Sequence, residues 1–134
     1  MRKKLFFVFI LVTVMSGWQN VVCAQELKVK AKLLEKSAEQ WLCGDQKIGV
    51  SMKYEVVSVL EGQLDEKEIY VVHYCPEISR PKYSSTAGSL RKFAVDDTHI
   101  MTLRPLDNTD FLVFDDYEEE NRTVYECLTV DLAD

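Results

Sequence analysis

The sequence predicts an all-β domain, built either as a small closed barrel or as a two-sheet sandwich. Three observations predict this class. Six segments have the residue pattern of strands, the one candidate helix lacks helical spacing of its apolar residues, and 134 residues make one domain rather than several. A chain of strands without helices buries its apolar side chains by packing two sheets together or by closing one sheet on itself.

Alternation and β-branched residues identify the strands. Residues 27–33 alternate apolar and basic side chains, which is typical of a strand with one buried face. Residues 69–75 form the clearest strand, and Pro76 ends it. The candidate helix at 34–42 has few and badly spaced apolar residues, so we expect a continuation of the first strand or a single turn there. The other strands are predicted at residues 48–60, 98–103, 111–114 and 123–130.

The first 24 residues have the anatomy of a cleavable signal peptide. Basic residues at positions 2–4 precede an apolar run at 5–15, and residues 22–24 offer small side chains at the recognition positions of signal peptidase. We therefore predict cleavage between Ala24 and Gln25, and a single domain of residues 25–134 in a periplasm or secreted. The apolar run is shorter than the roughly 20 residues that span a bilayer, so no membrane span is expected.

A lipoprotein attached through Cys23 is the alternative to cleavage at Ala24. The residues ahead of Cys23 are Asn20, Val21 and Val22. They lack the apolar residue three places ahead and the small residue directly ahead that lipid-directed processing uses, so cleavage after Ala24 is favoured.

The exported domain is acidic. The whole chain has 16 Lys+Arg against 22 Asp+Glu, and removing the three basic residues of the leader leaves 13 against 22, a net charge near −9. Nucleic acids and anionic membrane surfaces are bound by clustered positive charge. Neither is expected as a partner; we expect another extracytoplasmic protein, and no cofactor.

Three cysteines follow the leader: Cys43, Cys75 and Cys127. Cysteines of exported proteins usually pair, so we expect one disulfide and one remaining thiol, with all three pairings open. The remaining thiol is expected to be buried among apolar side chains, with an intermolecular disulfide or a reactive thiol as the alternatives.

The segment 76–92 interrupts the strand pattern. It is rich in Ser, Pro and basic residues, and loops of this length within a compact domain are often functional. We predict that a partner binds here and at the turn of residues 41–45, since tryptophan, here Trp41, is enriched at interaction hot spots. The alternative is a short helix or irregular excursion that only crosses the end of a barrel. The predicted contact residues are Arg80, Lys82, Arg91, Lys92 and Trp41.

Two sequence motifs resemble the secreted netrin-like domains, a family that includes the tissue inhibitors of metalloproteinases and bacterial relatives. Residues 54–62 (YEVVSVLEG), followed by 68–72 (EIYVV), resemble one strand, turn and strand of that family. Residues 93–97 (FAVDD), leading into 99–103 (HIMTL), resemble a later turn and strand, with Asp96 where the family has glycine.

The resemblance covers residues 27–104 and implies a barrel of the OB type with five or six strands. It does not imply metalloproteinase inhibition. In that family the inhibitor chelates the catalytic zinc with an N-terminal cysteine, whereas cleavage after Ala24 starts this chain at Gln25.

The sequence contains few residues that could carry chemistry. His73 and Cys75 are two apart and so are expected to share a sheet face, and a neighbouring His99 would complete three ligands for zinc or copper. No nucleophile elbow, phosphate-binding glycine loop or H-E-x-x-H motif is present. We therefore expect a non-enzymatic binding or interaction module, with a small metal-binding protein that uses His73, His99 and Cys75 as the alternative.

Overall fold

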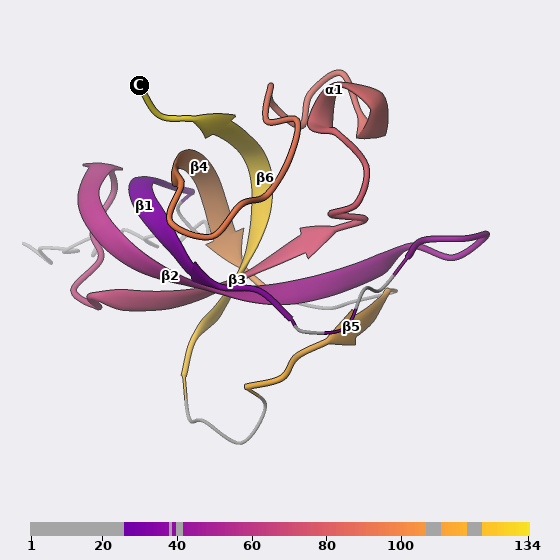
Figure 1. Ribbon diagram of the computed structural model, residues 1–134. Helices are drawn as coiled ribbons and strands as arrows, with labels where there is room; N and C mark the ends of the chain where they lie inside the picture. Colours follow the sequence, from indigo (N-terminus) through magenta and orange to yellow (C-terminus); the bar gives the residue numbers. More distant parts are fainter. Residues whose placement is uncertain (1–25, 38, 40–41, 107–110, 118–121) are drawn as a thin grey trace, which may run out of the picture.

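The computed structural model describes residues 26–37, 39, 42–106, 111–117 and 122–134. The predicted signal peptide, its cleavage site, Cys23 and Trp41 lie outside the described residues. The strands and the single short helix are β1 (Leu27–Glu35), β2 (Ile48–Glu61), β3 (Glu68–Tyr74), α1 (Arg80–Tyr83), β4 (Thr98–Pro105), β5 (Leu112–Phe114) and β6 (Val124–Leu132) (Figure 1). Each of the six predicted strands is confirmed. β1 continues to Glu35, which agrees with the expectation that residues 34–42 begin as a continuation of the first strand.

Five strands close into an OB-like barrel, which excludes the sandwich alternative. β1 pairs antiparallel with both β2 and β4, β2 pairs with β3, and β4 pairs with β6. The parallel pairing of β3 with β6 closes the ring. The sixth strand, β5, lies outside the ring and pairs parallel with the first residues of β2.

The alternation in the sequence sorts side chains between the core and the solvent. In β1, Leu27, Val29, Ala31 and Leu33 are buried, and the lysines between them face outward. Successive side chains of a strand point to opposite faces. The apolar residues of β1 therefore pack inside the barrel, and its lysines lie on the outer surface. Truncating a fully buried side chain such as Leu33 to alanine costs about 2–5 kcal/mol.

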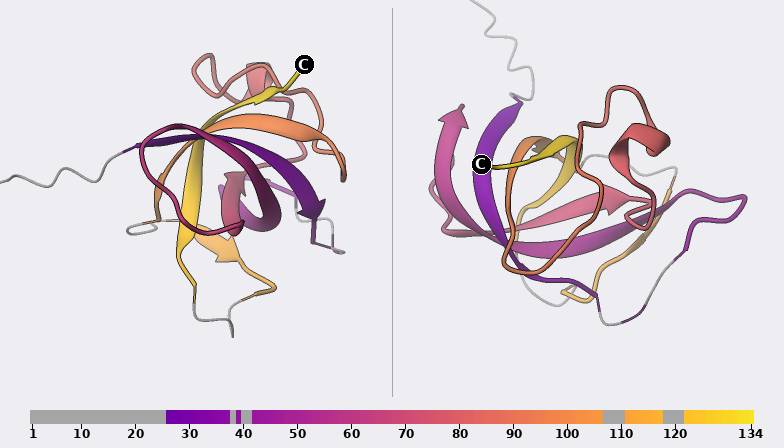
Figure 2. Two further views of the ribbon diagram at one scale, coloured as in Figure 1. Left: turned by 90° about the vertical axis from the view of Figure 1, so that its left-hand side faces the viewer. Right: turned by 45° about the horizontal axis from the view of Figure 1, so that its top comes forward.

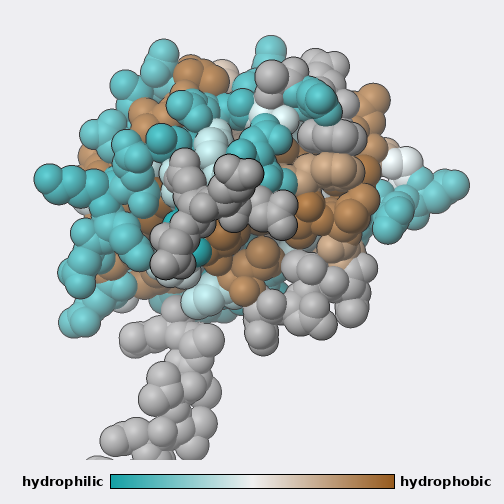
Figure 3. All heavy atoms as spheres, turned by 90° about the horizontal axis from the view of Figure 1, so that it is seen from below, coloured by the Kyte–Doolittle hydropathy of each residue, from teal (hydrophilic) through white to brown (hydrophobic). Residues whose placement is uncertain are grey.

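The outer surface is uneven. Seen from below, it is hydrophilic on one side, while apolar side chains gather on the other side, where β5 lies (Figure 3). Phe111 and Leu112 are among the exposed large apolar residues there.

The segment 76–97 crosses one end of the barrel. It contains the single turn of α1 and then an irregular chain that lies beside the last part of β6 (Figure 2). The path of this segment therefore confirms the expected short helix and irregular excursion across the barrel end.

The disulfide joins Cys43 to Cys75, and Cys127 is free. One bridge and one remaining thiol were predicted, and Cys127 packs, partly buried, against the core. A disulfide indicates an oxidising, extracytoplasmic environment. Within the described part of the chain, none of the helical structure is long and apolar enough to cross a membrane.

Candidate binding cleft at the barrel end

Arg80 holds the start of the crossing segment and does not belong to its surface. Its side chain is 4% exposed and donates hydrogen bonds to the carbonyls of Tyr74 (3.0 Å), Cys75 (2.7 Å) and Ile78 (2.9 Å). These carbonyls belong to residues at and just after the end of β3, where the chain leaves the sheet. The planar guanidinium donates a hydrogen bond to each of the three. The prediction that Arg80 contacts a partner is therefore wrong: the residue is structural.

The second half of the segment is fixed to β6. Val130 accepts a hydrogen bond from Leu90 N (3.2 Å) and donates one to Ala87 O (3.0 Å), while Ser89 donates to the Asp131 carboxylate. Gly88 between them has φ of 100°, and any side chain there would collide with the backbone of Val130. The segment is a fitted part of the fold, with few conformations open to it.

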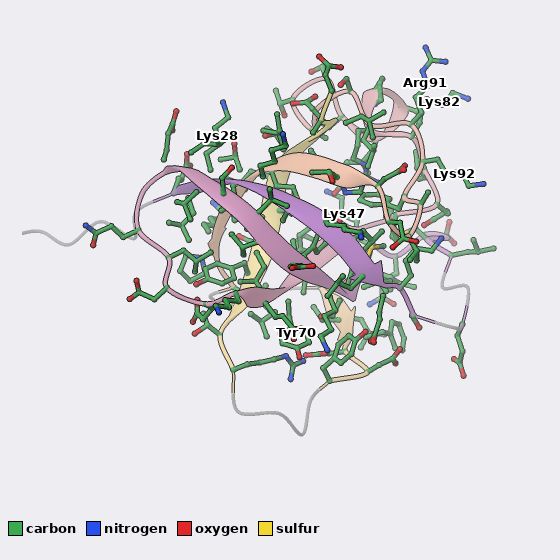
Figure 4. The ribbon with its side chains drawn as sticks, turned by 60° about the vertical axis from the view of Figure 1, so that its left-hand side comes forward. Lys28, Lys47, Tyr70, Lys82, Arg91 and Lys92 are labelled. Atoms are coloured by element: carbon green, nitrogen blue, oxygen red, sulfur yellow. A yellow bond between two sulfur atoms is a disulfide. The ribbon has the colours of Figure 1, made fainter. Side chains whose placement is uncertain are left out.

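The other three basic residues of the segment are exposed. Lys82, Arg91 and Lys92 lie on the same side of the molecule and point outward, with Lys28 of β1 on the other side of the barrel (Figure 4). Within the described residues, none of the three makes a side-chain hydrogen bond or an ion pair. Their charges are therefore available to a ligand.

Arg91 and Lys92 line a cleft of about 430 Å³, a volume within the range of ligand sites. Val50 and Met52 of β2 form its floor together with Phe93. Two segments far apart in the sequence face each other across it, the one between β1 and β2 and the one between α1 and β4. The remaining lining residues are Lys36, Ser37, Glu39, Leu42, Pro76 and Glu77.

Three bonds hold the walls of the cleft together. The Cys43–Cys75 disulfide ties the β1–β2 segment to the end of β3, and Cys43 N donates to Glu77 Oε1 over 2.7 Å. Lys36, on the same β1–β2 segment, donates from Nζ to Phe93 O on the facing segment over 3.0 Å. The covalent bridge joins the neighbours of Leu42 and Pro76, which both line the cleft.

The charges of the cleft differ from those of the chain. The lining carries Lys36, Arg91 and Lys92 against Glu39 and Glu77, whereas the whole chain has a formal net charge of −6. One oxygen of Glu77 is already engaged by the backbone. The described lining therefore has a small excess of positive charge in a chain that is acidic as a whole.

A second hollow, of about 410 Å³, lies at the turn between β2 and β3. It opens broadly to solvent, and its lining contains Asp65 and Glu66 but no cation. Tyr125 Oη donates to Glu66 there at 3.4 Å, a weak contact. Because its described lining is shallow and mostly polar or acidic, with only Leu64 and Tyr125 as apolar surface, this hollow has less of the character of a binding site.

Beneath the cleft, a tyrosine joins two core histidines. Tyr54 Oη lies 2.9 Å from His73 Nε2 and 3.1 Å from His99 Nδ1, and the histidines are 1% and 0% exposed. Burial lowers the pKa of both imidazoles, and the positive charge of Arg80 lowers that of His73 further. Burial also raises the pKa of the Tyr54 phenol, so all three groups are neutral near pH 7.

The hydrogen bonds of this cluster leave one donor over. Tyr54 has one proton, so it donates to one imidazole and accepts from the other. The imidazole that accepts from Tyr54 carries its own N–H on the opposite nitrogen, which is either His73 Nδ1 or His99 Nε2. Both of these atoms are buried and have no partner among the described residues. Whichever arrangement holds, one buried N–H points at no protein acceptor.

The three-residue metal site predicted from the sequence is wrong. Cys75 is bonded to Cys43 and has φ of 47°, so it has left the strand and no longer follows the alternation that would put it beside His73. His73 and His99 are brought together, but by Tyr54. In the described ranges the only group of three potential ligands is Cys43, Cys75 and Glu77, and two of these share the disulfide.

Cys127 is not a reactive thiol. Burial raises the pKa of its thiol, and Sγ donates to Thr129 O over 3.1 Å. A protonated, hydrogen-bonded thiol is a poor nucleophile and metal ligand. The expectation of a buried thiol fits the structure better than a reactive one.

Sequence reasoning identified Arg91 and Lys92 but missed Lys36, Met52 and Phe93. A lysine after a strand and an apolar residue within one carry no signal that they line a cleft. Phe93 begins the FAVDD motif of the netrin-like resemblance, but that motif does not indicate a cleft.

The chain has no recognisable relative in three comparisons. Comparison with protein-family models, with curated proteins and with solved structures finds no match. The likeness to netrin-like domains therefore stays a prediction, and the functional argument depends on the cleft.

Proposed function

We propose that this chain is an exported, non-enzymatic binding module that holds another extracytoplasmic protein at the cleft formed by Val50, Met52, Phe93, Arg91 and Lys92. One observation carries the proposal: two segments distant in sequence meet over an apolar floor, and Arg91 and Lys92 on the rim make no side-chain hydrogen bond or ion pair with the described residues. An apolar base with charges at its edge is the usual composition of a recognition site.

The residues around the cleft favour binding over catalysis. The buried imidazoles lie behind Phe93 and are held neutral by their surroundings, and the thiol of Cys127 is protonated. An acid–base catalyst needs a group that reaches the substrate with a pKa near the working pH. The described lining of the cleft contains lysine, arginine and glutamate side chains but no histidine or free cysteine.

Export and a distant netrin-like origin belong to the same proposal. The leader-like first 24 residues support export, and the disulfide agrees with it. An OB-like barrel is what the netrin-like resemblance implies. At Asp96, where that family has glycine, φ is 76°, a backbone conformation that glycine adopts without strain.

Site-specific photocrosslinking tests the proposal. A photoreactive amino acid at Leu42, which lines the cleft and is 63% exposed, is compared with the same residue at Val57, which is 57% exposed on the far half of β2. After irradiation in the native extracytoplasmic fluid, we expect a discrete protein adduct from position 42 and none from position 57. Equal adducts from both positions, or none from position 42, would remove the cleft as the contact surface.

A further inference from the structure

We infer that the cleft recognises an extended acidic segment of the partner, which inserts one apolar side chain between carboxylates. This inference rests on the proposed function and gives the chemistry of its ligand.

The rim selects for negative charge. Arg91 and Lys92 are exposed at its edge, Lys36 stands opposite, and Lys82 adds a further cation on the same side of the molecule (Figure 4). The chain as a whole is acidic. Lysines also line the outer face of β1, so the combination of cations with an apolar floor is what distinguishes the rim. Such a combination steers a ligand to one place and orientation.

The floor selects for an apolar group. Val50, Met52 and Phe93 line the cleft, are almost fully buried and have apolar side chains. Phe93 is rigid there, because its ring packs against His73 (centroids 4.4 Å apart) and the guanidinium of Arg80 lies 5.5 Å from its centre. A charged group at this depth would lose its hydration without gaining a partner, so a carboxylate stays at the rim.

The separation of the two features favours a peptide over a small molecule. Small ligands are mostly enclosed, with their polar anchors inside the pocket. Here the cations stand at the open edge and only apolar groups form the base. A chain that passes over the cleft satisfies both, since it places successive side chains alternately into the floor and along the rim.

Selection from a displayed library of random short peptides tests this inference. Wild-type exported protein is the bait, and the Arg91→Gln/Lys92→Gln double variant is the counter-selection. We expect the enriched peptides to carry Asp or Glu on both sides of a Leu, Ile, Met or Phe. Enrichment of basic peptides, or of acidic peptides with no preference for an apolar residue, would overturn the inference.

Calorimetric titration of one selected peptide supplies the magnitudes. We expect the Arg91→Gln/Lys92→Gln variant to bind about 10-fold more weakly, the effect of two ion pairs at a partly screened edge. Lys28→Gln/Lys30→Gln, which removes the same charge from β1, is the matched control and should change affinity by less than about 2-fold. Equal losses in the two variants would mean that only net charge matters, which contradicts a defined site.

The peptide experiment and the crosslinking experiment separate two kinds of failure. If no acidic peptide binds but position 42 still gives its adduct, the ligand chemistry is wrong and the proposed function stands. If a basic peptide binds and Glu39→Gln weakens it, the cleft is a binding site of the opposite sign. If neither experiment finds a ligand, both the inference and the proposed function fall.

Discussion

The ring of Phe93 lies 4.4 Å from the ring of His73, centroid to centroid, so one side chain is both the floor of the cleft and the cover of a buried imidazole. The same phenyl ring also contacts His99, at 5.8 Å. The cleft and the polar cluster in the core therefore share a wall. Substitutions in the cluster test how much of the stability of that wall comes from hydrogen bonds.

Replacing Tyr54 with phenylalanine removes one hydroxyl and leaves two buried histidine nitrogens without a partner. We expect the free energy of unfolding to fall by about 1–3 kcal/mol, the usual cost of buried polar groups left unpaired. Urea denaturation measures the loss. The control is Tyr125→Phe, whose hydroxyl makes only the 3.4 Å contact with Glu66 and should cost less than about 0.5 kcal/mol. A Tyr54 variant as stable as the control would show that the cluster does not depend on the bridge.

The two histidines predict that acid destabilises the domain. They are the only histidines in the chain, and burial lowers the pKa of each below the ordinary 6.5. Asp97 opposes this for His99, while Arg80 reinforces it for His73. Unfolding frees both rings to bind protons, so the unfolded state binds more protons than the folded one below pH 6.5, and stability is lost as the pH falls from there.

The limiting slope is about 1.4 kcal/mol per pH unit for each ring. Urea midpoints measured from about pH 8 to about pH 5.5 cover this window, which lies above the range where carboxylates titrate. We expect a plateau above pH 6.5 and a decline below it. A stability that is constant or rises on acidification through this range would contradict neutral, buried imidazoles.

Arg80 predicts a stability effect where a surface cation would show none. Arg80→Gln removes a buried charge together with hydrogen bonds to the carbonyls of Tyr74, Cys75 and Ile78, so we expect a loss of about 2–4 kcal/mol. Arg80→Lys should rescue little of it, because an ammonium cannot span three carbonyls. Lys82→Gln, two residues on and exposed, is the matched control, with an expected change within about 0.5 kcal/mol. Thermal melting of the three variants distinguishes these outcomes, and an Arg80→Lys variant as stable as wild type would contradict the geometry.

The disulfide predicts coupled losses of stability and binding. Cys43 and Cys75 are 32 residues apart, and opening a loop of that size costs about 2–4 kcal/mol. In the Cys43→Ser/Cys75→Ser variant we expect this loss and a cleft that no longer holds its peptide, because the bridge fixes one wall. Cys127→Ala keeps the bridge and should lose less than about 1 kcal/mol and no binding. A double variant that is destabilised but binds normally would show that the wall stands without the bridge.

The strands were predictable from the sequence, and most of the site was not. Alternation over residues 27–33 and the apolar run before Pro76 are local signals, and burial on one face makes such signals reliable. The Cys43–Cys75 pairing joins residues 32 positions apart, and the sequence gives no reason to prefer it over the other two pairings of three cysteines. The sequence did not distinguish Arg80 from its exposed basic neighbours, because the carbonyls that accept its hydrogen bonds lie at the end of β3 and backbone carbonyls leave no mark in a sequence.

The metal prediction failed for a related reason. The rule that residues two apart share a face holds only inside a strand, and β3 ends at Tyr74. Cys75 is already in a left-handed turn, which aims it at Cys43. The metal site required His99 to lie near His73, and both do contact one hydroxyl, but that hydroxyl comes from Tyr54, on a third strand.

The parallel pairing of β3 with β6 sets an order of events for a chain that reaches its compartment N-terminus first. The first three strands form a local meander, and both cysteines of the bridge emerge with them. The ring can close only after residues 124–132 arrive, since β6 alone joins β3 to β4. Oxidation of the cysteines is thus possible on an open sheet, and the last strand to emerge completes the barrel around a wall that is already covalently fixed.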